Sequence, residues 1–333
     1  MFRMPLNYMQ EIRNNWKESE ILEIYETPIL DLVYHAASVH REFHNPHEIQ
    51  ISSLLSVKTG GCSEDCKYCS QSSLYDTSTE EEPMMPIASV IEAAKEAKAK
   101  GSNRFCMGTA WREIPDDQMH LVTEMIEAVR NLEMEVCATM GMVTQAQATE
   151  LKNAGLTAYN HNLDSGESYY DKIVSTRSYS DRLKTITALQ NAGIGICSGG
   201  IIGMGEKTND RVDLLMHLSN LDKHPESVPV NILVPIEGTP IEKDLNFNFW
   251  DLLRTVATAR ILMPTTFVRL SAGRKDLSDI EQAFCFLAGA NSIFAGEKLL
   301  TTSNREENKD TELFELLGLS PKQPFKSAIN NAE

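Results

Sequence analysis

Three cysteines stand close together after a pair of glycines, in the segment TGGCSEDCKYC. They are Cys62, Cys66 and Cys69, so their spacing is C-x3-C-x2-C. Thiolates at this spacing indicate a metal site, because deprotonated cysteine binds both zinc and iron–sulfur clusters. A closed zinc site needs a fourth ligand, for which a distant histidine such as His161 is the candidate. A 4Fe-4S cluster on three thiolates instead leaves one iron free for a small molecule, and this interpretation is favoured.

The other four cysteines are scattered along the chain. Cys106, Cys137 and Cys197 each fall inside a run of residues typical of a β-strand, whereas Cys285 lies in an apolar helical segment. Any one of them could be core packing, since free cysteine is among the most buried residue types. Three cysteines on separate strands favour a second metal site, with an iron–sulfur cluster as the natural occupant. Cys285 is interpreted as a packing residue.

Amide and carboxylate side chains lie along the predicted strand AYNHNLD. Side chains alternate along a strand, so Asn160, Asn162 and Asp164 should share one face and His161 should lie on the other. Asn231 lies near the end of a later predicted strand. Amides suit a neutral urea, amide or purine, and a carboxylate commonly binds a ribose diol. Such residues elsewhere often only cap helices and turns.

A glycine-rich run extends from Gly199 to Glu206 at the end of another predicted strand. It does not fit the G-x-G-x-x-G pattern that cradles phosphate. Glycines at a strand end let a flat cofactor approach the backbone, or they make a tight turn before the next helix. Thr301 and Thr302, which follow the last predicted strand, could cap a helix or bind a ligand carboxylate.

Short apolar or β-branched runs alternate with amphipathic helical stretches from residue 51 onward. This alternation is typical of βα units around a parallel sheet. Eight such units in about 280 residues predict an α/β fold of the (β/α)8 TIM-barrel type, with a doubly wound open sheet as the alternative. The predicted strands are residues 53–58, 104–109, 135–140, 158–164, 195–202, 229–235, 267–272 and 292–297.

A single domain, residues 1–333, is predicted, because no linker rich in proline, glycine or serine divides the chain. Its parts are an N-terminal helical extension at residues 1–50, a barrel core at 51–302, and a C-terminal helix and short tail at 303–333. The last segment, SPKQPFKSAINNAE, predicts a loose tail because its composition offers little to bury.

Two helices are predicted within the N-terminal extension, around residues 7–20 and 27–42. Thr27 is the expected N-cap of the second helix, and Pro28 would occupy its first helical position. Proline is favoured there because the missing N–H would have no helical partner in any case. These helices precede the barrel units and are interpreted as an extension before the barrel.

The composition excludes several classes of function. The chain has 333 residues, of which 42% are hydrophobic, enough to bury a core without disulfides. Its 31 basic and 47 acidic residues give a net charge of −16, which disfavours nucleic acid or an anionic membrane as the main partner. It contains no apolar run long enough for a membrane span or a secretory signal. A cytoplasmic location is therefore expected, where free thiols serve as metal ligands or catalytic groups.

The motifs taken together resemble a known family. The cysteine spacing, with Tyr68 before the last cysteine, matches the signature of the radical S-adenosylmethionine (SAM) superfamily. From about residue 20 to 320 the chain is similar to the biotin synthase family. The segments that carry this resemblance are TGGCSEDCKYCSQSS, FCMGTAWR, YNHNLD, CSGGIIGMGE, NILVPIEGTP, VRLSAGR and FLAGANSIFAGEKLLTT.

The resemblance implies a sulfurtransferase with a (β/α)8 barrel that forms a homodimer. It would convert dethiobiotin to biotin, the last step of biotin biosynthesis, by inserting sulfur between two unactivated carbons. Two SAM molecules would supply 5'-deoxyadenosyl radicals, and a 2Fe-2S cluster would supply the sulfide. An electron donor such as flavodoxin or ferredoxin and the iron–sulfur assembly machinery would be partners. Radical chemistry suits this substrate, because aliphatic C–H bonds carry no acidic proton for a general base.

The same resemblance implies a role for each motif residue. The 4Fe-4S cluster, which also binds SAM, would be held by Cys62, Cys66 and Cys69. The 2Fe-2S cluster would be held by Cys106, Cys137, Cys197 and Arg269. SAM would be contacted by Tyr68, Asn162, Asp164, Arg182, Gly199, Gly200, Gly203 and Glu206. Dethiobiotin would be contacted by Asn162, Asn231, Thr301 and Thr302. The loop cysteines and Arg269 would be the catalytic set.

Three points stay open at this level. Arginine is a rare iron ligand, so the role of Arg269 rests on the family alone. After Asp164 the chain reads SGESYY where the family more often has a Thr-Ser-Pro-Glu run, which leaves any contact from Ser165 undecided. A different radical SAM enzyme would share the cysteine loop without needing the second cluster, and a metal carrier would not need the amide cluster.

Overall fold

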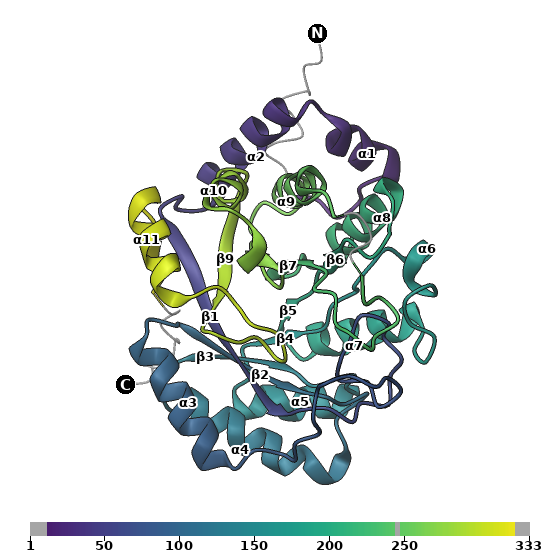
Figure 1. The fold of residues 1–333 in the computed structure, drawn as a ribbon, viewed down its shortest axis with the longest axis vertical. Coiled ribbons are helices and arrows are strands. Elements are labelled where there is room, and N and C mark those ends of the chain that lie inside the picture. The colour runs from purple at the N-terminus through teal and green to yellow at the C-terminus, as the bar shows by residue number, and fades with distance from the viewer. Residues whose placement is uncertain (1–11, 244–246, 324–333) are drawn as a thin grey trace.

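The computed structural model describes residues 12–243 and 247–323, and parallel strands form its centre (Figure 1). The barrel strands are β1 (Glu48–Lys58), β2 (Arg104–Thr109), β3 (Glu135–Thr139), β4 (Ala158–Asn160), β5 (Gly195–Cys197), β6 (Gly200–Ile202), β7 (Ser227–Ile232), β8 (Phe267–Leu270) and β9 (Ala290–Ala295). They pair in the order β1-β2-β3-β4-β5-β7-β8-β9, and β9 pairs back with β1. The predicted barrel is confirmed, because an open sheet would leave two edges unpaired.

Amphipathic helices cover the outside of the barrel (Figure 1). The helices are α1 (Glu18–Glu26), α2 (Ile29–Phe43), α3 (Ile87–Ala99), α4 (Met119–Arg130), α5 (Gln145–Ala154), α6 (Glu167–Tyr170), α7 (Tyr179–Asn191), α8 (Thr208–Ser219), α9 (Phe249–Leu262), α10 (Asp279–Leu287) and α11 (Glu307–Leu317). In α4, for example, Val122, Met125 and Val129 are buried at helical spacing. Among the helices the structure describes, none is long and apolar enough to cross a membrane.

Only the strand predicted at residues 104–109 matches the observed one at both ends without a break; the others are shifted, shortened, extended or split, and β1 starts five residues earlier than predicted. Two of the differences bear on the site. The strand predicted at residues 158–164 stops at Asn160, because Asp164 adopts a left-handed conformation with φ of 68°. The strand predicted at 195–202 is split into β5 and β6. At the break, the backbone N–H of Asp164 donates to the carbonyl of Gly199 at 3.0 Å. The chain after β4 therefore leaves the ladder and pairs with the start of β6.

The N-terminal helices begin later than predicted. The first was expected around residues 7–20, but α1 starts at Glu18; positions 7–11 lie outside the described residues. Thr27 does not cap α2: its hydroxyl donates to the carbonyl of Glu23 at 3.1 Å and so ends α1, while Pro28 takes the cap position. In Figure 1 these helices lie beside α8 and α9, and α1 packs on α8 while α2 packs on α9.

The C-terminal segment stays hydrogen bonded to the barrel beyond the residue where the loose tail was predicted to begin. The surface helix is present as α11, but residues 320–322, expected as the start of a loose tail, hydrogen bond to β1. Ser320 N–H donates to the carbonyl of His47 and Lys322 N–H to that of Ile49, both at 2.8 Å. The start of β1 projects beyond the barrel, and this short strand β10 (Ser320–Pro321) satisfies its backbone groups. Residues 324–333 lie outside the described part.

A buried ion pair fastens α11 to the closing strands of the barrel. Both nitrogens at the end of the Arg274 side chain donate to Asp310, at 2.7 and 2.6 Å, and both side chains are almost fully buried. Arg274 also donates to the carbonyl of Phe294 on β9 at 3.3 Å. Arg305 adds a second cation 3.1 Å from the Asp310 carboxylate. Removing one partner of such a pair leaves an uncompensated buried charge.

We expect Asp310→Asn to lower the free energy of unfolding by about 3 kcal/mol, because Arg274 would stay buried without its counter-charge. The matched control is Asp279→Asn. Asp279 also pairs with Arg305, at 2.6 Å, but its side chain is 60% exposed, so the loss should stay below about 1 kcal/mol. Urea unfolding followed by circular dichroism measures both. Equal losses in the two variants would contradict this assignment.

Candidate active site

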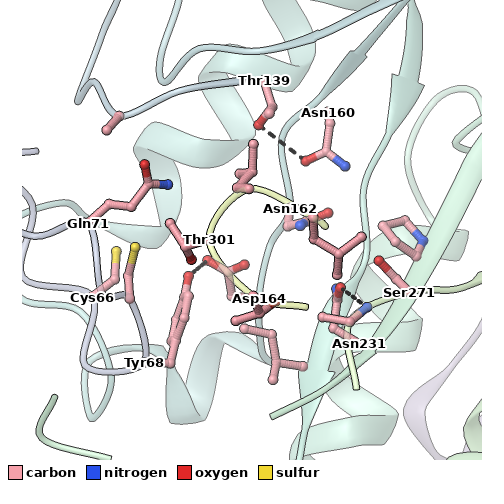
Figure 2. A pocket seen from close by; sticks show the side chains of 18 of the residues that line it. Cys66, Tyr68, Gln71, Thr139, Asn160, Asn162, Asp164, Asn231, Ser271 and Thr301 are labelled. Atoms are coloured by element: carbon pink, nitrogen blue, oxygen red, sulfur yellow. Dashed lines mark hydrogen bonds between the residues drawn. The ribbon is translucent and has the colours of Figure 1, made fainter. Parts of the chain in front are cut away.

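A cavity of about 340 Å³ opens at the carboxyl ends of the barrel strands. Its walls come from the ends of many strands and the loops that follow them, which is where (β/α)8 barrels carry their active sites. Figure 2 shows Cys66 and Tyr68 on one side of this cavity and Asn160, Asn231 and Ser271 on the other. The amides and thiols that the sequence singled out are therefore brought into one space.

The cysteine loop after β1 forms one wall of the cavity. Cys62, Cys66 and Cys69 are all free thiols and all line the cavity. Gly60 and Gly61 both have φ of 69°, a conformation that only glycine adopts without strain, and they start the loop. Backbone hydrogen bonds then close it, including Cys69 N–H to the carbonyl of Cys66 at 2.9 Å. The loop thus places three thiols on the wall of one cavity.

Burial makes these loop thiols weak acids in the metal-free protein. It raises the pKa of Cys66 to about 11 and that of Cys69 to about 12. Metal binding must therefore displace protons from them, since thiolate is the ligand form. The described residues contain no group of three histidine, cysteine or acidic side chains placed to hold a single metal ion.

The second set of thiols lies on the barrel strands themselves. Register pairs Cys106 on β2 with Cys137 on β3, and pairs Asn160 on β4 with Cys197 on β5. Cys106 and Cys137 share a hydrogen bond, which lowers the pKa of Cys106 and raises that of Cys137. Cys197 accepts a hydrogen bond from the Asn160 amide at 3.2 Å and lies 3.3 Å from the Ser227 hydroxyl. All three thiols are buried, as predicted for strand residues facing the barrel interior.

Arg269 on β8 points into the same layer as these three thiols. Its side chain is fully buried; Nε donates to Ser292 at 2.8 Å and Nη2 to Gln50 at 3.0 Å. Nη1 faces the sulfur of Cys197 at 3.6 Å. No carboxylate among the described residues forms an ion pair with Arg269. A buried cation needs compensation, and thiolates beside it can supply that charge. The donor set therefore fits an anionic, sulfur-ligated metal cluster.

Asp164 connects the cysteine loop to the far side of the barrel. Its Oδ2 accepts a hydrogen bond from the Tyr68 hydroxyl at 2.6 Å and a second one from Arg182. Desolvation raises the pKa of Tyr68 well above its usual value, so this hydroxyl stays a donor. The backbone of Asp164 is left-handed and held by hydrogen bonds to Gly199 and Ile201. Strained backbone held by several contacts is typical of functional positions.

The glycine-rich run lies beside the cavity and shapes it from outside. A Cβ on Gly199 would come within 1.9 Å of the Pro229 carbonyl oxygen, so only glycine allows the chain between β5 and β6 to approach β7 there. A Cβ on Gly200 would come within 2.8 Å of the Asp164 carbonyl oxygen. Glu206 accepts hydrogen bonds from the backbone of Gly203 at 3.2 Å and closes the turn after β6. In the described chain, none of the run's predicted SAM contacts, Gly199, Gly200, Gly203 and Glu206, is part of the cavity lining.

Asn231, Thr301 and Thr302 do line the cavity, whereas Cys197 and Arg269 are not part of its lining. Asn231 on β7 donates from its amide to the carbonyl of Gly200 at 3.0 Å, so it also ties β6 to β7. Thr301 and Thr302 come from the loop after β9, and the Thr301 hydroxyl accepts a hydrogen bond from Ser70 at 3.2 Å. The loop after β9 therefore meets the cysteine loop over the cavity. The Ser165 hydroxyl is buried and donates to the carbonyl of Gly166 at 3.0 Å.

Several residues that line the cavity were not predicted from the sequence or were predicted on the wrong face. His161 was expected on the face opposite the asparagines, but it lines the same cavity because β4 ends before it. Glu64 and Arg177 also line the cavity, and neither was identified. A charged residue inside the C-x3-C segment could have drawn attention to Glu64. Arg177 lies in the connection between α6 and α7, where no spacing pattern marks it.

Comparison with known proteins gives matches over nearly the whole chain. Residues 56–218 match the Radical SAM superfamily and residues 229–320 match the Biotin and Thiamin Synthesis associated domain. The chain is 56% identical to a biotin synthase of Cytophaga hutchinsonii, covering 96% of this chain and 95% of that protein. It is 53% identical to the mitochondrial biotin synthase of Arabidopsis thaliana, covering 94% and 83% respectively.

Solved structures share the fold at much lower identity. Methylornithine synthase superposes with a TM-score of 0.79 at 16% identity, covering 95% of this chain and 96% of that one. The FeFe-hydrogenase maturase HydG from Carboxydothermus hydrogenoformans also gives a TM-score of 0.79, at 18% identity, covering 92% and 76%. At such identities the likeness concerns the barrel alone.

The pKa shifts predict how the loop thiols react in metal-free protein. With a pKa of about 11, Cys66 should react with iodoacetamide at pH 8 roughly 100-fold more slowly than in urea, where cysteine has its ordinary pKa. The rate in native protein should keep rising about tenfold per pH unit above pH 9, where the rate in urea levels off. Peptide mapping by mass spectrometry measures the labelling of each cysteine. An alkylation rate of Cys66 in native protein that levels off at pH 9 would refute its raised pKa.

Proposed function

The chain belongs to the biotin synthase family of the radical SAM superfamily, and on that premise we propose that it converts dethiobiotin to biotin by radical sulfur insertion. The observation that carries the proposal is the placement of two sets of free thiols in one barrel, one at the cavity wall and one on the strands. When bound, a 4Fe-4S cluster with SAM would supply the 5'-deoxyadenosyl radical, and a 2Fe-2S cluster would supply the sulfide.

The two clusters would be held by different parts of the fold. Cys62, Cys66 and Cys69 would hold the first cluster. Tyr68 of the same loop donates a hydrogen bond to Asp164. The deeper cluster would be held by Cys106, Cys137, Cys197 and Arg269. Among the arginine nitrogens, Nη1 faces a thiol ligand of this cluster, whereas Nε and Nη2 donate to Ser292 and Gln50. To bind iron, Nη1 would have to give up a proton, because a guanidinium N–H is only a donor.

SAM would lie between the cysteine loop and the chain after β4. Tyr68 and Arg182 both bind Oδ2 of Asp164, which leaves Oδ1 available to accept a hydrogen bond from a ribose hydroxyl. Arg182 also donates to the carbonyl of Asn162 at 2.6 Å and to the Tyr170 hydroxyl at 2.8 Å. In this arrangement Arg182 orients Asp164 and Asn162, and these two residues meet the ribose.

Dethiobiotin would occupy the space between SAM and the deeper thiols. Asn162 and Asn231 offer amides to its neutral ureido ring, and Thr301 and Thr302 offer hydroxyls to its carboxylate. Apolar side chains from the same walls limit the water that can reach a radical; they include Ile232, Val234, Leu299 and Leu300. Holding both reactants in one cavity keeps the radical near its target carbon.

Further parts of the proposal come from the family. The protein would act as a homodimer, accept electrons from a donor such as flavodoxin or ferredoxin, and rely on the iron–sulfur assembly machinery. Residues 1–333 would act as one domain, since the segments matched by both family descriptions contribute strands to the same closed barrel.

Anaerobic reconstitution tests the function directly. We expect the protein to bind two spectroscopically distinct iron–sulfur clusters and to form biotin from dethiobiotin when SAM and a reductant are added. Absorption and Mössbauer spectra report the clusters, and mass spectrometry reports biotin. Clusters without biotin would indicate a different radical SAM enzyme. Zinc alone, with no cluster after reconstitution, would reject the proposal altogether.

Mutations in the two sets of thiols should abolish different activities, SAM cleavage or biotin formation. Cys66→Ala should abolish SAM cleavage, because the open iron that binds SAM would be lost. Cys137→Ala should keep SAM cleavage and lose biotin formation, because only the sulfur source is affected. Cys285→Ala is the matched control, since this buried thiol on α10 lies outside both sets and its loss should leave both activities intact. SAM cleavage by Cys66→Ala at the normal rate would contradict the assignment.

A further inference from the structure

Charged side chains lie at the amino end of the barrel, where branched aliphatic residues would be the usual filling. Arg104 begins β2, and Glu135 begins β3 and pairs with it in register. Nε of Arg104 donates to Glu135 at 2.9 Å, and Nη2 donates to Glu226, which precedes β7. Arg104 is fully buried, whereas the Glu226 side chain is 24% exposed. These three residues form the amino-end triad, which lies between solvent and the barrel interior.

The amino-end triad lies one layer below the deeper thiols. Arg104 precedes Cys106 by two residues on β2, and Glu135 precedes Cys137 by two residues on β3. Residues two apart on a strand share a face, so each pair points into the barrel. The register between β2 and β3 sets Cys106 opposite Cys137, just as it sets Arg104 opposite Glu135. Arg104 is accordingly among the charged groups that act on both thiols.

One nitrogen of Arg104 has no acceptor in the described chain. Nε and Nη2 bind the two carboxylates, but Nη1 is buried and makes no hydrogen bond to any described residue. A buried donor without a partner is costly. Arg260, which is equally buried, places all three of its nitrogens on acceptors, including the carbonyl of Gly289. The protein can thus satisfy such a group by itself, and Nη1 of Arg104 is suited to an acceptor that a ligand supplies.

The two carboxylates of the amino-end triad fix the orientation of Arg104. They occupy adjacent nitrogens of its planar guanidinium group, so the direction of Nη1 is set by the plane. Gly195 makes room for one of them: it precedes Cys197 by two residues on β5, and a Cβ there would clash with the Glu226 carboxylate. The orphaned nitrogen is therefore held in place by residues from three parts of the barrel.

We propose that Arg104 is a positioning residue that donates a hydrogen bond from Nη1 to a sulfur atom of the 2Fe-2S cluster. This inference rests on the proposed function, which assigns that cluster to the deeper thiols and Arg269. Arg269 reaches this layer from β8, beside Cys197, whereas Arg104 lies below the other two thiols. Hydrogen bonds to sulfur help to set the reduction potential of an iron–sulfur cluster. Arg104 would raise this potential, because its N–H stabilises the negative charge that reduction adds.

Anaerobic redox titration of reconstituted wild type and Arg104→Lys tests this inference. Lysine keeps the positive charge beside the two carboxylates but has no Nη1. At the wild-type midpoint potential of the 2Fe-2S cluster, the ratio of oxidised to reduced cluster should rise about tenfold in the variant. The midpoint of the 4Fe-4S cluster on the loop thiols should stay unchanged. Arg260→Lys is the matched control, since Arg260 is equally buried but bound to backbone carbonyls, and neither midpoint should move.

An unchanged 2Fe-2S midpoint in Arg104→Lys, or an equal shift of both clusters, would overturn the inference. If the variant does not fold or load, wild type with nitrogen-15 in its arginine side chains decides. Pulsed EPR of the reduced 2Fe-2S cluster should then show two different nitrogen couplings, a stronger one from Arg269 and a weaker one from Arg104; a single coupling contradicts the inference. Wild type that binds two clusters and forms biotin keeps the proposed function even when this inference fails.

Discussion

A buried guanidinium group must find acceptors for its N–H donors and compensation for its charge, and this requirement decides what the barrel interior can hold. Arg260 meets it with neutral groups: its nitrogens donate to backbone carbonyls, including that of Gly289 at 2.8 Å. Burial lowers the pKa of Arg260 to about 9. Arg269 is satisfied on two nitrogens and turns the third to the sulfur of Cys197. Arg260 therefore has backbone oxygens as its main acceptors, whereas Arg269, which lies beside the thiols, also faces a sulfur atom.

The positive charge of these buried arginines is opposite in sign to the net charge of the chain. The net charge of −16 describes a surface on which acidic side chains dominate. Along the cavity and the layer beneath it, Arg177 and Arg269 have no carboxylate of their own within hydrogen-bond distance in the described chain. Buried charges are screened little by salt, so they act on a bound ligand more strongly than surface groups do. A protein with a negative net charge can therefore still offer buried cations to anionic groups in its interior.

Local spacing predicted much of the site. The C-x3-C-x2-C loop was evident because its ligands are close in sequence, and strand alternation correctly placed Cys106 and Cys137 toward the interior. Alternation failed where the strand stopped: β4 ends at Asn160, so His161 joins the residues it was expected to oppose. The role of Thr27 was wrong because its hydroxyl had a closer acceptor in the preceding helix. A residue such as Arg177 carries no local pattern, and only its lack of partners in the folded chain reveals it.

The two sets of thiols are held with different rigidity. Cys106, Cys137 and Cys197 belong to strands whose ladder fixes their spacing, so their arrangement follows from closing the barrel. The loop thiols depend instead on contacts made across the cavity. Tyr68 reaches Asp164 and Asp65 reaches the segment before Arg177, so the loop is held from two sides. Residues that bind the loop in place also face the space where SAM would lie. A ligand in that space would therefore contact residues that also hold the loop, whereas the deeper layer is held by the sheet.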